Sequence, residues 1–279
     1  MQEHSDRCSV AQLCRKLGVS RSGYYSWLRR PRSKRAIENE ALVEHIKAIH
    51  TENRELYGSP RVHASLKERG QHYNIKRVAR LMRENGIASK VTRRFKPRKQ
   101  NYLTYTHVPN LLLERGIPTQ KNQIWVGDVT YIRVNGSWTY LAVVMDLCTR
   151  KILGWAYGSH RKFDLVKEAL SMAVSTSPPS KDTIFHSDQG IEYTVSTYQQ
   201  LVKSYGITPS MSRKGHCWDN AWTESFFHTL KTEMIYFQKF SNLPEATAYI
   251  MDYVTFFNHK RIHSSLNYST PNQYHLEAA

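Results

Sequence analysis

Hydrophobic and polar residues follow two different periods along this chain, and the change from one to the other falls near Asn122. Before it, apolar residues recur every three or four positions, as at 10, 13, 14 and 17 and again at 42, 43, 46 and 49. This spacing is typical of amphipathic helices. After it, short apolar runs of strand character alternate with helical patterns. The sequence therefore predicts a helical N-terminal part followed by an α/β part.

The first helical segment, residues 1–36, has the pattern of a helix–turn–helix. Gly18 permits a tight turn after the first helix, and Ser20 is a good N-cap for the second. Arg21, Arg29 and Arg30 lie outside the apolar positions and are expected to meet DNA phosphates. Gly23 weakens the pattern, because glycine inside a helix costs about 1 kcal/mol relative to alanine.

A second segment of the same type covers residues 37–95. Pro60 starts one helix that ends at Gly70, and Asn74 caps another that ends at Gly86. On the last helix Lys76, Arg77 and Arg80 point away from the apolar face, and DNA contact is the favoured interpretation. The alternative is an ordinary helical hairpin with a solvated basic face. Residues 96–120 are basic, interrupted by proline and without periodicity, so they are expected to form a linker.

Residues 121–279 are expected to form a catalytic α/β domain with a C-terminal helical extension. Asn135-Gly136 is a strong signal for a two-residue hairpin turn between the first two strands. The expected strands cover 123–134, 137–147, 151–159, 183–190 and 207–212, and the expected helices cover 163–175, 197–206 and 219–234. Three consecutive strands followed by alternating helices and strands predict a mixed sheet flanked by helices.

Charge is distributed unevenly between the two parts. The chain of 279 residues carries a formal net charge of +17, and residues 1–110 hold 24 Lys and Arg against 9 Asp and Glu. An excess confined to one part indicates a polyanion-binding module joined to a nearly neutral one, and nucleic acid is the favoured polyanion. The alternative is a basic surface that serves only solubility.

Several other classes of protein are disfavoured. No run of about 18–20 apolar residues could span a membrane, and the N-terminus lacks the apolar core of a signal peptide. The four cysteines form no CxxC pair, and the zinc-like spacing of His259 and His263 has no cysteine pair beside it. A protein of the reduced cytoplasm, without disulfides or structural zinc, is expected.

Three acidic residues occupy unusual places in the α/β pattern. Asp128 interrupts an apolar strand, Asp188 ends another, and Glu224 lies on the last helix away from its apolar stripe. A carboxylate inside a core strand is costly unless its charge is compensated. The alternative interpretation is that these are ordinary cap and turn carboxylates, as expected for Asp146 at a strand end and Asp219 at a helix start.

If the three carboxylates converge, their mutual repulsion favours divalent cations, and oxygen ligands suit Mg²⁺, with Mn²⁺ as a substitute. Two such ions about 3.5–4 Å apart can activate a water or a 3′-hydroxyl and stabilise the leaving oxygen of a phosphoryl transfer. Three acids in a mixed sheet are by themselves a weak signal for such a site.

The motifs around these acids resemble those of a known family. WVGDVTYI, HSDQG and DNAWTESFF are similar to the three acidic motifs of DDE transposases and retroviral integrases, with 35 residues between Asp188 and Glu224. SRSGYYSWLRR, YGSPRVHASL, RVARLMRENGI, SRKGHCWDNA and NHKRIHSSLNYSTP extend the resemblance over nearly the whole chain. The closer resemblance is to the second reading-frame product of bacterial insertion sequences of the IS-three family.

This resemblance implies an RNase H-like integrase core in which Asp128, Asp188 and Glu224 hold two Mg²⁺ ions. It implies cleavage at the element's terminal inverted repeats and transfer of the freed 3′-hydroxyl to target DNA. Lys231 resembles an integrase lysine that contacts terminal DNA, and the alternative is a solvated helix lysine. Arg261 and His263 match a family motif and either bind DNA or simply pack, and His186 either orients a ligand or fills the strand end.

The resemblance also implies a homo-multimer on DNA, because two ends must be brought together. In the family, a short upstream reading-frame product is commonly fused to this one, so such a product is an expected partner. Three functions remain as hypotheses: an active transposase, a catalytically silent or decayed DNA-binding relative, and a hydrolytic nuclease on the same core. The basic N-terminal segments favour duplex DNA over the hybrid duplex of a ribonuclease.

Overall fold

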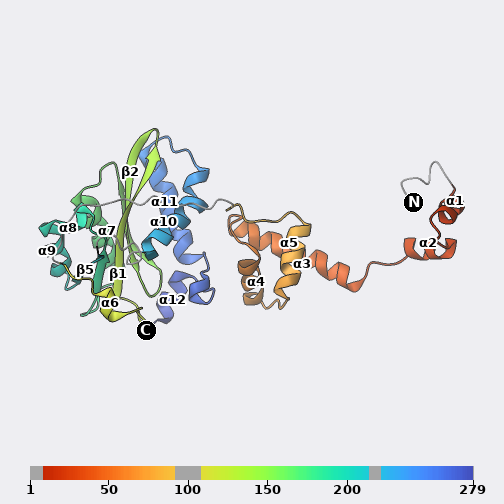
Figure 1. Cartoon of the computed structure of the whole chain (residues 1–279), viewed down its shortest axis with the longest axis horizontal. Helices are drawn as coiled ribbons and strands as arrows, with labels where there is room; N and C mark the ends of the chain where they lie inside the picture. The colour runs from red at the N-terminus through yellow and green to blue at the C-terminus, as the bar shows by residue number, and fades with distance from the viewer. Residues whose placement is uncertain (1–8, 92–107, 214–220, 279) are drawn as a thin grey trace.

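The N-terminal third of the chain is helical in a computed structural model that describes residues 9–91, 108–213 and 221–278 (Figure 1). Its helices are α1 (Val10–Lys16), α2 (Arg21–Leu28), α3 (Lys34–Glu52), α4 (Ser59–Glu68) and α5 (Ile75–Glu84). Ser9, Ser20, Ser33 and Asn74 cap four of them by accepting backbone N–H bonds. The α1–α2 pair has the expected helix–turn–helix form, with Gly18 in a left-handed conformation (φ 66°) at the turn.

Helices α3, α4 and α5 pack together around their apolar faces. The side chains that form this core are fully or almost fully buried: Leu42, Ile46, Ile49, Val62, Leu66, Val78, Leu81 and Met82. Helix α3 begins at Lys34, three residues before the expected start of the second segment, because Ser33 supplies its cap. Part of the expected linker, residues 92–107, lies outside the described residues, and the part that is described includes the short helix α6 (Leu112–Arg115).

A five-stranded mixed sheet lies at the centre of the C-terminal part. The strands are β1 (Ile124–Val134), β2 (Ser137–Asp146), β3 (Ile152–Gly158), β4 (Ile184–Ser187) and β5 (Thr208–Met211). Their order is β3-β2-β1-β4-β5; β1, β2 and β3 form an antiparallel meander, and β4 and β5 run parallel to β1. Asn135 and Gly136 both have positive φ at the β1–β2 turn, as the sequence predicts for this hairpin.

Helices cover both faces of the sheet. One face packs against α7 (Phe163–Thr176), α8 (Ile191–Thr194) and α9 (Ser196–Ser204). The other packs against α10 (Ala221–Glu233) and α11 (Leu243–His259), which are followed by α12 (Pro271–Glu277) (Figure 1). Alternate residues of β1 enter the two cores: Ile124 and Val126 lie on the α10 side and Trp125 on the α7 side. Within the described residues, no helix is both long and apolar enough to cross a membrane.

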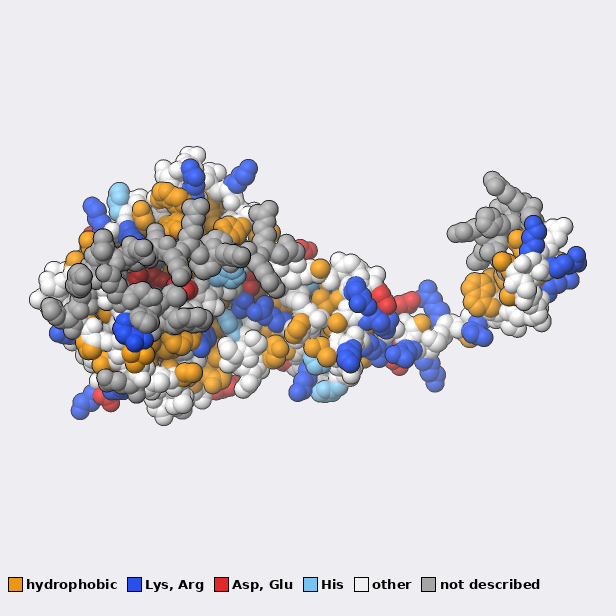
Figure 2. All heavy atoms as spheres, viewed as in Figure 1, with side chains coloured by type: hydrophobic (Ala, Val, Ile, Leu, Met, Phe, Trp, Pro, Cys, Tyr) orange, Lys and Arg blue, Asp and Glu red, His pale blue; other side chains and the backbone are white. Residues whose placement is uncertain are grey.

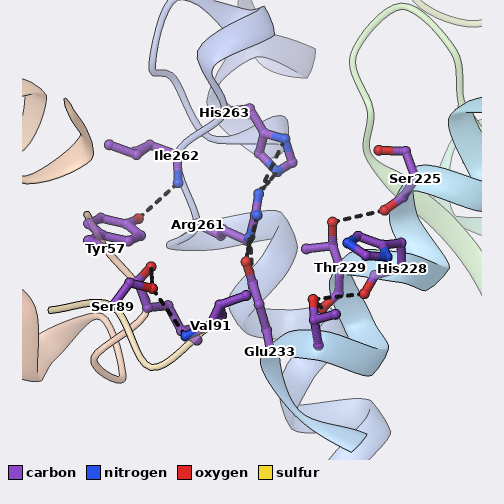
Figure 3. A network of polar contacts seen from close by, with 12 residues as sticks. Tyr57, Ser89, Val91, Ser225, His228, Thr229, Glu233, Arg261, Ile262 and His263 are labelled. Carbon is purple, nitrogen blue, oxygen red and sulfur yellow. Dashed lines mark hydrogen bonds and ion pairs between the residues drawn. The ribbon is translucent and has the colours of Figure 1, made fainter. Parts of the chain in front are cut away.

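The α3–α5 unit is joined to the C-terminal helices by buried and charged contacts. Tyr57, which is fully buried, donates its hydroxyl to the Lys260 carbonyl (3.1 Å) and accepts the Ile262 N–H (3.0 Å) (Figure 3). The Arg54 guanidinium bonds to Asp252 on α11 and lies 4.3 Å from the centre of the Phe256 ring. The apolar core of the α3–α5 unit is therefore continuous with the core on the α10 side of the sheet.

Close packing between β3 and α7 depends on Gly154. A Cβ at this position would lie 2.1 Å from the Ala169 carbonyl oxygen and 2.5 Å from the Ala173 nitrogen, both on the backbone of α7. Because backbone atoms cannot move aside cheaply, we expect Gly154→Ala to lower the free energy of unfolding by about 1–3 kcal/mol, measured by urea denaturation. Gly158→Ala, on the same strand, meets only Leu165 Cδ1 at 3.6 Å and should be nearly neutral. Equal stability of the two variants would contradict this account of the packing.

Candidate active site

Asp128 and Asp188 lie on neighbouring parallel strands at matching positions. Gly127 on β1 pairs with Ser187 on β4, and each aspartate is the next residue along its strand. Neighbouring strands lie about 4.8 Å apart, so the register places these two residues side by side. The Val129 N–H donates to Asp128 Oδ1 (2.7 Å), and the Gly190 N–H donates to Asp188 Oδ1 (2.9 Å).

Glu224 reaches the same region from α10. Phe226, Phe227 and Leu230 anchor this helix in the core, whereas Glu224 is exposed on another side of it. α10 packs along β1, and the Glu224 carboxylate in its first turn interacts electrostatically with both Asp188 and Asp128. The sequence prediction that Glu224 lies off the apolar face is confirmed.

Electrostatic repulsion links the three acids. Burial raises the pKa of Asp128 well above its usual value, and the carboxylates of Asp188 and Glu224 raise it further. Burial raises the pKa of Glu224 as well, again with a contribution from Asp188. The pKa of Asp188 is also raised, mainly by burial. The three acidic side chains therefore interact electrostatically in one partly buried region, where each disfavours the ionised form of its neighbours.

The chemistry of these donors fits a hard divalent cation, because carboxylate oxygens are the ligands that Mg²⁺ and Mn²⁺ prefer. A cation between the acids would also relieve the repulsion that raises their pKa values. As they stand, no three Asp, Glu, His or Cys side chains of the described part of the chain are grouped closely enough to hold a metal ion.

A fourth acid, Glu192, belongs to this cluster, although the sequence did not single it out. Its side chain is almost fully buried, and it raises the pKa of both Asp128 and Asp188. Arg161 binds Glu192 Oε1 through Nε (2.9 Å) and a terminal nitrogen (2.7 Å), while the buried Oε2 has no hydrogen-bond partner among the residues that the structure describes. The available signal was its spacing, four residues after Asp188 and just inside the helix that follows Gly190.

Two other polar residues near the strand ends have structural roles. Asp146, fully buried, accepts bonds from the Asn122 N–H, the Thr149 N–H and the Thr149 hydroxyl, so it stabilises a turn as the simpler interpretation predicts. His186 is fully buried between the hydroxyls of Ser210 (2.9 Å) and Ser212 (3.0 Å) and fills the strand end. Asp219, the expected helix cap, lies outside the described residues.

Lys231 is not a solvated helix lysine. Its ammonium lies 4.8 Å from the centre of the Tyr131 ring, and the side chain is partly buried. Burial lowers the pKa of Lys231, and the nearby Asp128 carboxylate opposes that shift. A cation is therefore held beside the acidic cluster.

Arg261 lies inside the protein, which favours the packing alternative over a DNA contact. Its side chain is 5 % exposed, and its guanidinium bonds to both carboxylate oxygens of Glu233 at 2.7–3.2 Å (Figure 3). It also donates to the His263 ring (3.1 Å). Burial, followed by the charges of Arg261 and two other arginines, lowers the pKa of His263 to about 2, so this ring is a neutral acceptor. Both residues therefore have packing roles in the described structure.

The other predicted DNA contacts lie in the helical part, where Lys and Arg side chains are prominent (Figure 2). Arg21, Arg29, Arg30 and Lys76 are exposed. The remaining two have protein partners: Arg77 bonds to Asn39 (2.9 Å) and Glu38 (3.2 Å), and Arg80 bonds to Glu84 (2.8 Å). The Arg80–Glu84 pair is partly exposed and therefore weak, whereas the Arg77 side chain is only 19% exposed.

The sheet order, the flanking helices and the acids at the β1–β4 junction define an RNase H-like integrase core with an HTH-like domain before it. Residues 118–217 and 205–271 match two family models, each described as an integrase core domain, and residues 37–95 match an HTH-like domain. A similar solved structure is that of the simian T-cell lymphotropic virus intasome in complex with PP2A regulatory subunit B56 gamma. It has a TM-score of 0.50 and 20% identity, covering 76% of this chain and 70% of that one.

Curated relatives match almost the whole chain. The 31 kDa protein of insertion element IS600 from Shigella sonnei is 38% identical, over 96% of this chain and 100% of its own length. Transposase InsF for insertion sequence IS3A from Escherichia coli K12 is 34% identical, over 98% of this chain and 96% of its own. The chain belongs to the IS3-type family of insertion-sequence transposases, DNA-binding polynucleotidyl transferases of the DDE superfamily.

Proposed function

We propose that Asp128, Asp188 and Glu224 are the catalytic residues with which this transposase cleaves the ends of an insertion sequence and joins them to another DNA strand. The observation that carries this proposal is the β1–β4 register, which sets Asp128 beside Asp188 within electrostatic reach of Glu224. These three are also the acids of the motifs that resemble the DDE family. The Glu192 side chain is buried near them and forms an ion pair with Arg161.

The three carboxylates would hold two Mg²⁺ ions, with Mn²⁺ as a substitute. When bound, this pair of ions supplies activation of the attacking oxygen and stabilisation of the leaving oxygen in an in-line phosphoryl transfer. The chain itself contributes the fixed strand backbone under two of the acids, which reduces the reorganisation needed in the transition state. Lys231 contributes a positive charge next to Asp128 that can bind a phosphate of the reacting strand.

The N-terminal helices would hold the element's terminal inverted repeats while the core acts on the cleavage site and the target DNA. Arg21, Arg29, Arg30 and Lys76 are exposed for phosphate contacts, and Arg77 and Arg80 would join them by exchanging their carboxylate partners. Because two ends must meet, we propose a homo-multimer assembled on DNA. The upstream reading-frame product, as a fusion or a separate partner, would add further contacts to the ends.

The proposed function is tested with labelled duplex element ends and the purified chain, with Mg²⁺ or Mn²⁺ and with a chelator as the control. Products in which the labelled end is joined to a second DNA are expected with either metal, and none with the chelator. The reaction is run with and without the upstream product, so that a requirement for it is detected directly.

The products distinguish the three hypotheses for this chain. Joined ends support the transposase. Cleavage without joining, under conditions in which both ends and the upstream product are present, indicates a hydrolytic nuclease instead. Tight binding with neither product indicates a catalytically silent regulator or a decayed copy.

A further inference from the structure

The end of the β1–β2 hairpin carries large aromatic side chains that face solvent. The Tyr131 side chain is 44% exposed and that of Trp138 is 52% exposed. The two rings meet edge to face, with centroids 5.1 Å apart and planes at 86°. Figure 2 shows hydrophobic side chains gathered over this end of the catalytic domain. Exposed aromatic residues grouped in this way generally mark a binding surface.

Cations accompany these rings. The Arg133 guanidinium lies 5.6 Å from the centre of the Trp138 ring, and the Lys231 ammonium lies 4.8 Å from that of Tyr131. Tyr236, on the 3₁₀ turn η3 (Ile235–Phe237), is 49% exposed, and partial burial together with the neighbouring Tyr131 raises its pKa. We call these five residues, Tyr131, Arg133, Trp138, Lys231 and Tyr236, the hairpin platform.

The hairpin platform adjoins the acidic cluster. Tyr131 follows Asp128 by three residues on β1, so the two side chains point to opposite faces of the strand. In the described structure β4 pairs with β1 only as far as Gly127, so this part of β1 is an edge that a side chain or a DNA strand can pass around. Lys231 connects the hairpin platform to the acidic cluster, because its ammonium lies against the Tyr131 ring and interacts with the Asp128 carboxylate. A DNA strand whose phosphodiester lies at Asp128 would therefore have its next nucleotides within reach of the platform.

Aromatic rings that alternate with Arg and Lys side chains suit single-stranded nucleic acid in particular. Single-stranded nucleic acid offers flat base surfaces for stacking and phosphates for Arg and Lys, whereas a duplex keeps its base faces covered by neighbouring base pairs. A protein partner would have to place acidic groups against Arg133 and Lys231 as well as cover the rings. The location next to acids that act on DNA favours the nucleic acid.

We propose that the hairpin platform binds unpaired nucleotides of the DNA strand adjoining the phosphodiester at the acidic cluster, with bases stacked on Trp138 and Tyr131. The inference rests on the proposed function, because it takes the reacting strand to pass Asp128. It adds that the DNA end is opened locally at the cleavage site. The separated bases are then held by stacking, which does not depend on their sequence.

The test compares two DNA ends of the same sequence, one fully paired and one with the nucleotides beside the cleavage site left unpaired. Binding is measured by fluorescence anisotropy with Glu224→Gln protein, which retains the platform but lacks a catalytic acid. We expect Trp138→Ala and Tyr131→Ala each to weaken binding of the unpaired end about ten-fold, with little effect on the paired end. Tyr131→Phe and Trp138→Phe, which keep a ring, should retain most of the affinity.

Tyr268→Ala is the matched control, because this tyrosine is 38% exposed in the turn between Leu266 and Pro271. It should leave both affinities unchanged, and thermal melting shows whether each variant is folded. A 2-aminopurine base beside the cleavage site should be quenched by binding to protein with Trp138 and not by the alanine variant. No loss of affinity, an equal loss for both ends, or a loss of self-association alone overturns the proposal.

The outcome is separable from that of the proposed function. If the wild-type chain shows no metal-dependent cleavage or joining but still prefers unpaired ends through Trp138, the platform stands and the catalytic proposal fails. If the wild-type chain joins ends and the alanine variants bind unpaired ends as tightly as the wild type does, the catalytic proposal stands and the platform proposal fails.

Discussion

Asp128→Asn, Asp188→Asn and Glu224→Gln are each expected to reduce strand cleavage and joining about a thousand-fold or more. The loss of one carboxylate would weaken the proposed metal ligation, and a loss of about 4 kcal/mol of transition-state stabilisation corresponds to a thousand-fold in rate, at 1.36 kcal/mol for each ten-fold. DNA binding should be largely retained, because the predicted phosphate contacts lie on other residues. Gel assays of joined and cleaved products, beside a binding measurement, check both expectations.

The same substitutions are expected to raise stability when metal is absent. Burial and neighbouring carboxylates raise the pKa of Asp128 in the folded protein, so its ionised form destabilises the fold at pH values above the unfolded pKa. Asparagine removes that charge, and Asp128→Asn should therefore melt at a higher temperature than the wild type in a chelator. Added Mg²⁺ should stabilise the wild type and have little effect on the variant.

Asp182→Asn is the control for both measurements, because Asp182 is exposed on a loop away from the cluster. It should change neither joining nor the response of the melting temperature to Mg²⁺. Joining at the wild-type rate by any of the three cluster variants would remove that acid from the catalytic set.

The sequence predicted most of the sheet because local pattern decides it. The apolar runs matched β1, β2 and β3 to within a residue or two at their ends, and the Asn135-Gly136 turn fixed the hairpin between the first two. Helix α7 was likewise predicted from its apolar spacing. The three acids were recognised because each breaks or avoids a local apolar pattern, and motif resemblance, rather than that local signal, connected them.

What the sequence could not predict depends on residues far apart in the chain. The burial of Arg261 follows from its partner Glu233, 28 residues earlier, and local spacing carries no information about that pair. Glu192 enters the acidic cluster through Arg161, 31 residues before it. The exposed rings of Tyr131 and Trp138 occupy strand positions at which aromatic residues are usually half-buried, so only the structure distinguishes them from core residues.

Arg261→Ala is expected to lower the free energy of unfolding by about 3–5 kcal/mol, or the melting temperature by roughly 6–20 °C. Its removal leaves the Glu233 carboxylate buried, with the Tyr253 hydroxyl at 2.8 Å as its remaining side-chain partner in the described structure. Lys47→Ala is the control, because it breaks an ion pair with Glu44 in which both side chains are more than half exposed, and it should cost at most about 0.5 kcal/mol.

The double variant Arg261→Met with Glu233→Leu distinguishes packing from DNA contact. Replacing both charges with apolar side chains removes the uncompensated carboxylate, so much of the stability lost in Arg261→Ala should return. Measured below its melting temperature, this variant should bind element ends as the wild type does, because the Arg261 guanidinium faces Glu233 and His263 rather than solvent. A folded double variant with strongly reduced DNA affinity would restore Arg261 as a phosphate contact. An Arg261→Ala variant whose free energy of unfolding lies within about 1 kcal/mol of the wild-type value would contradict the expected cost of breaking this buried ion pair.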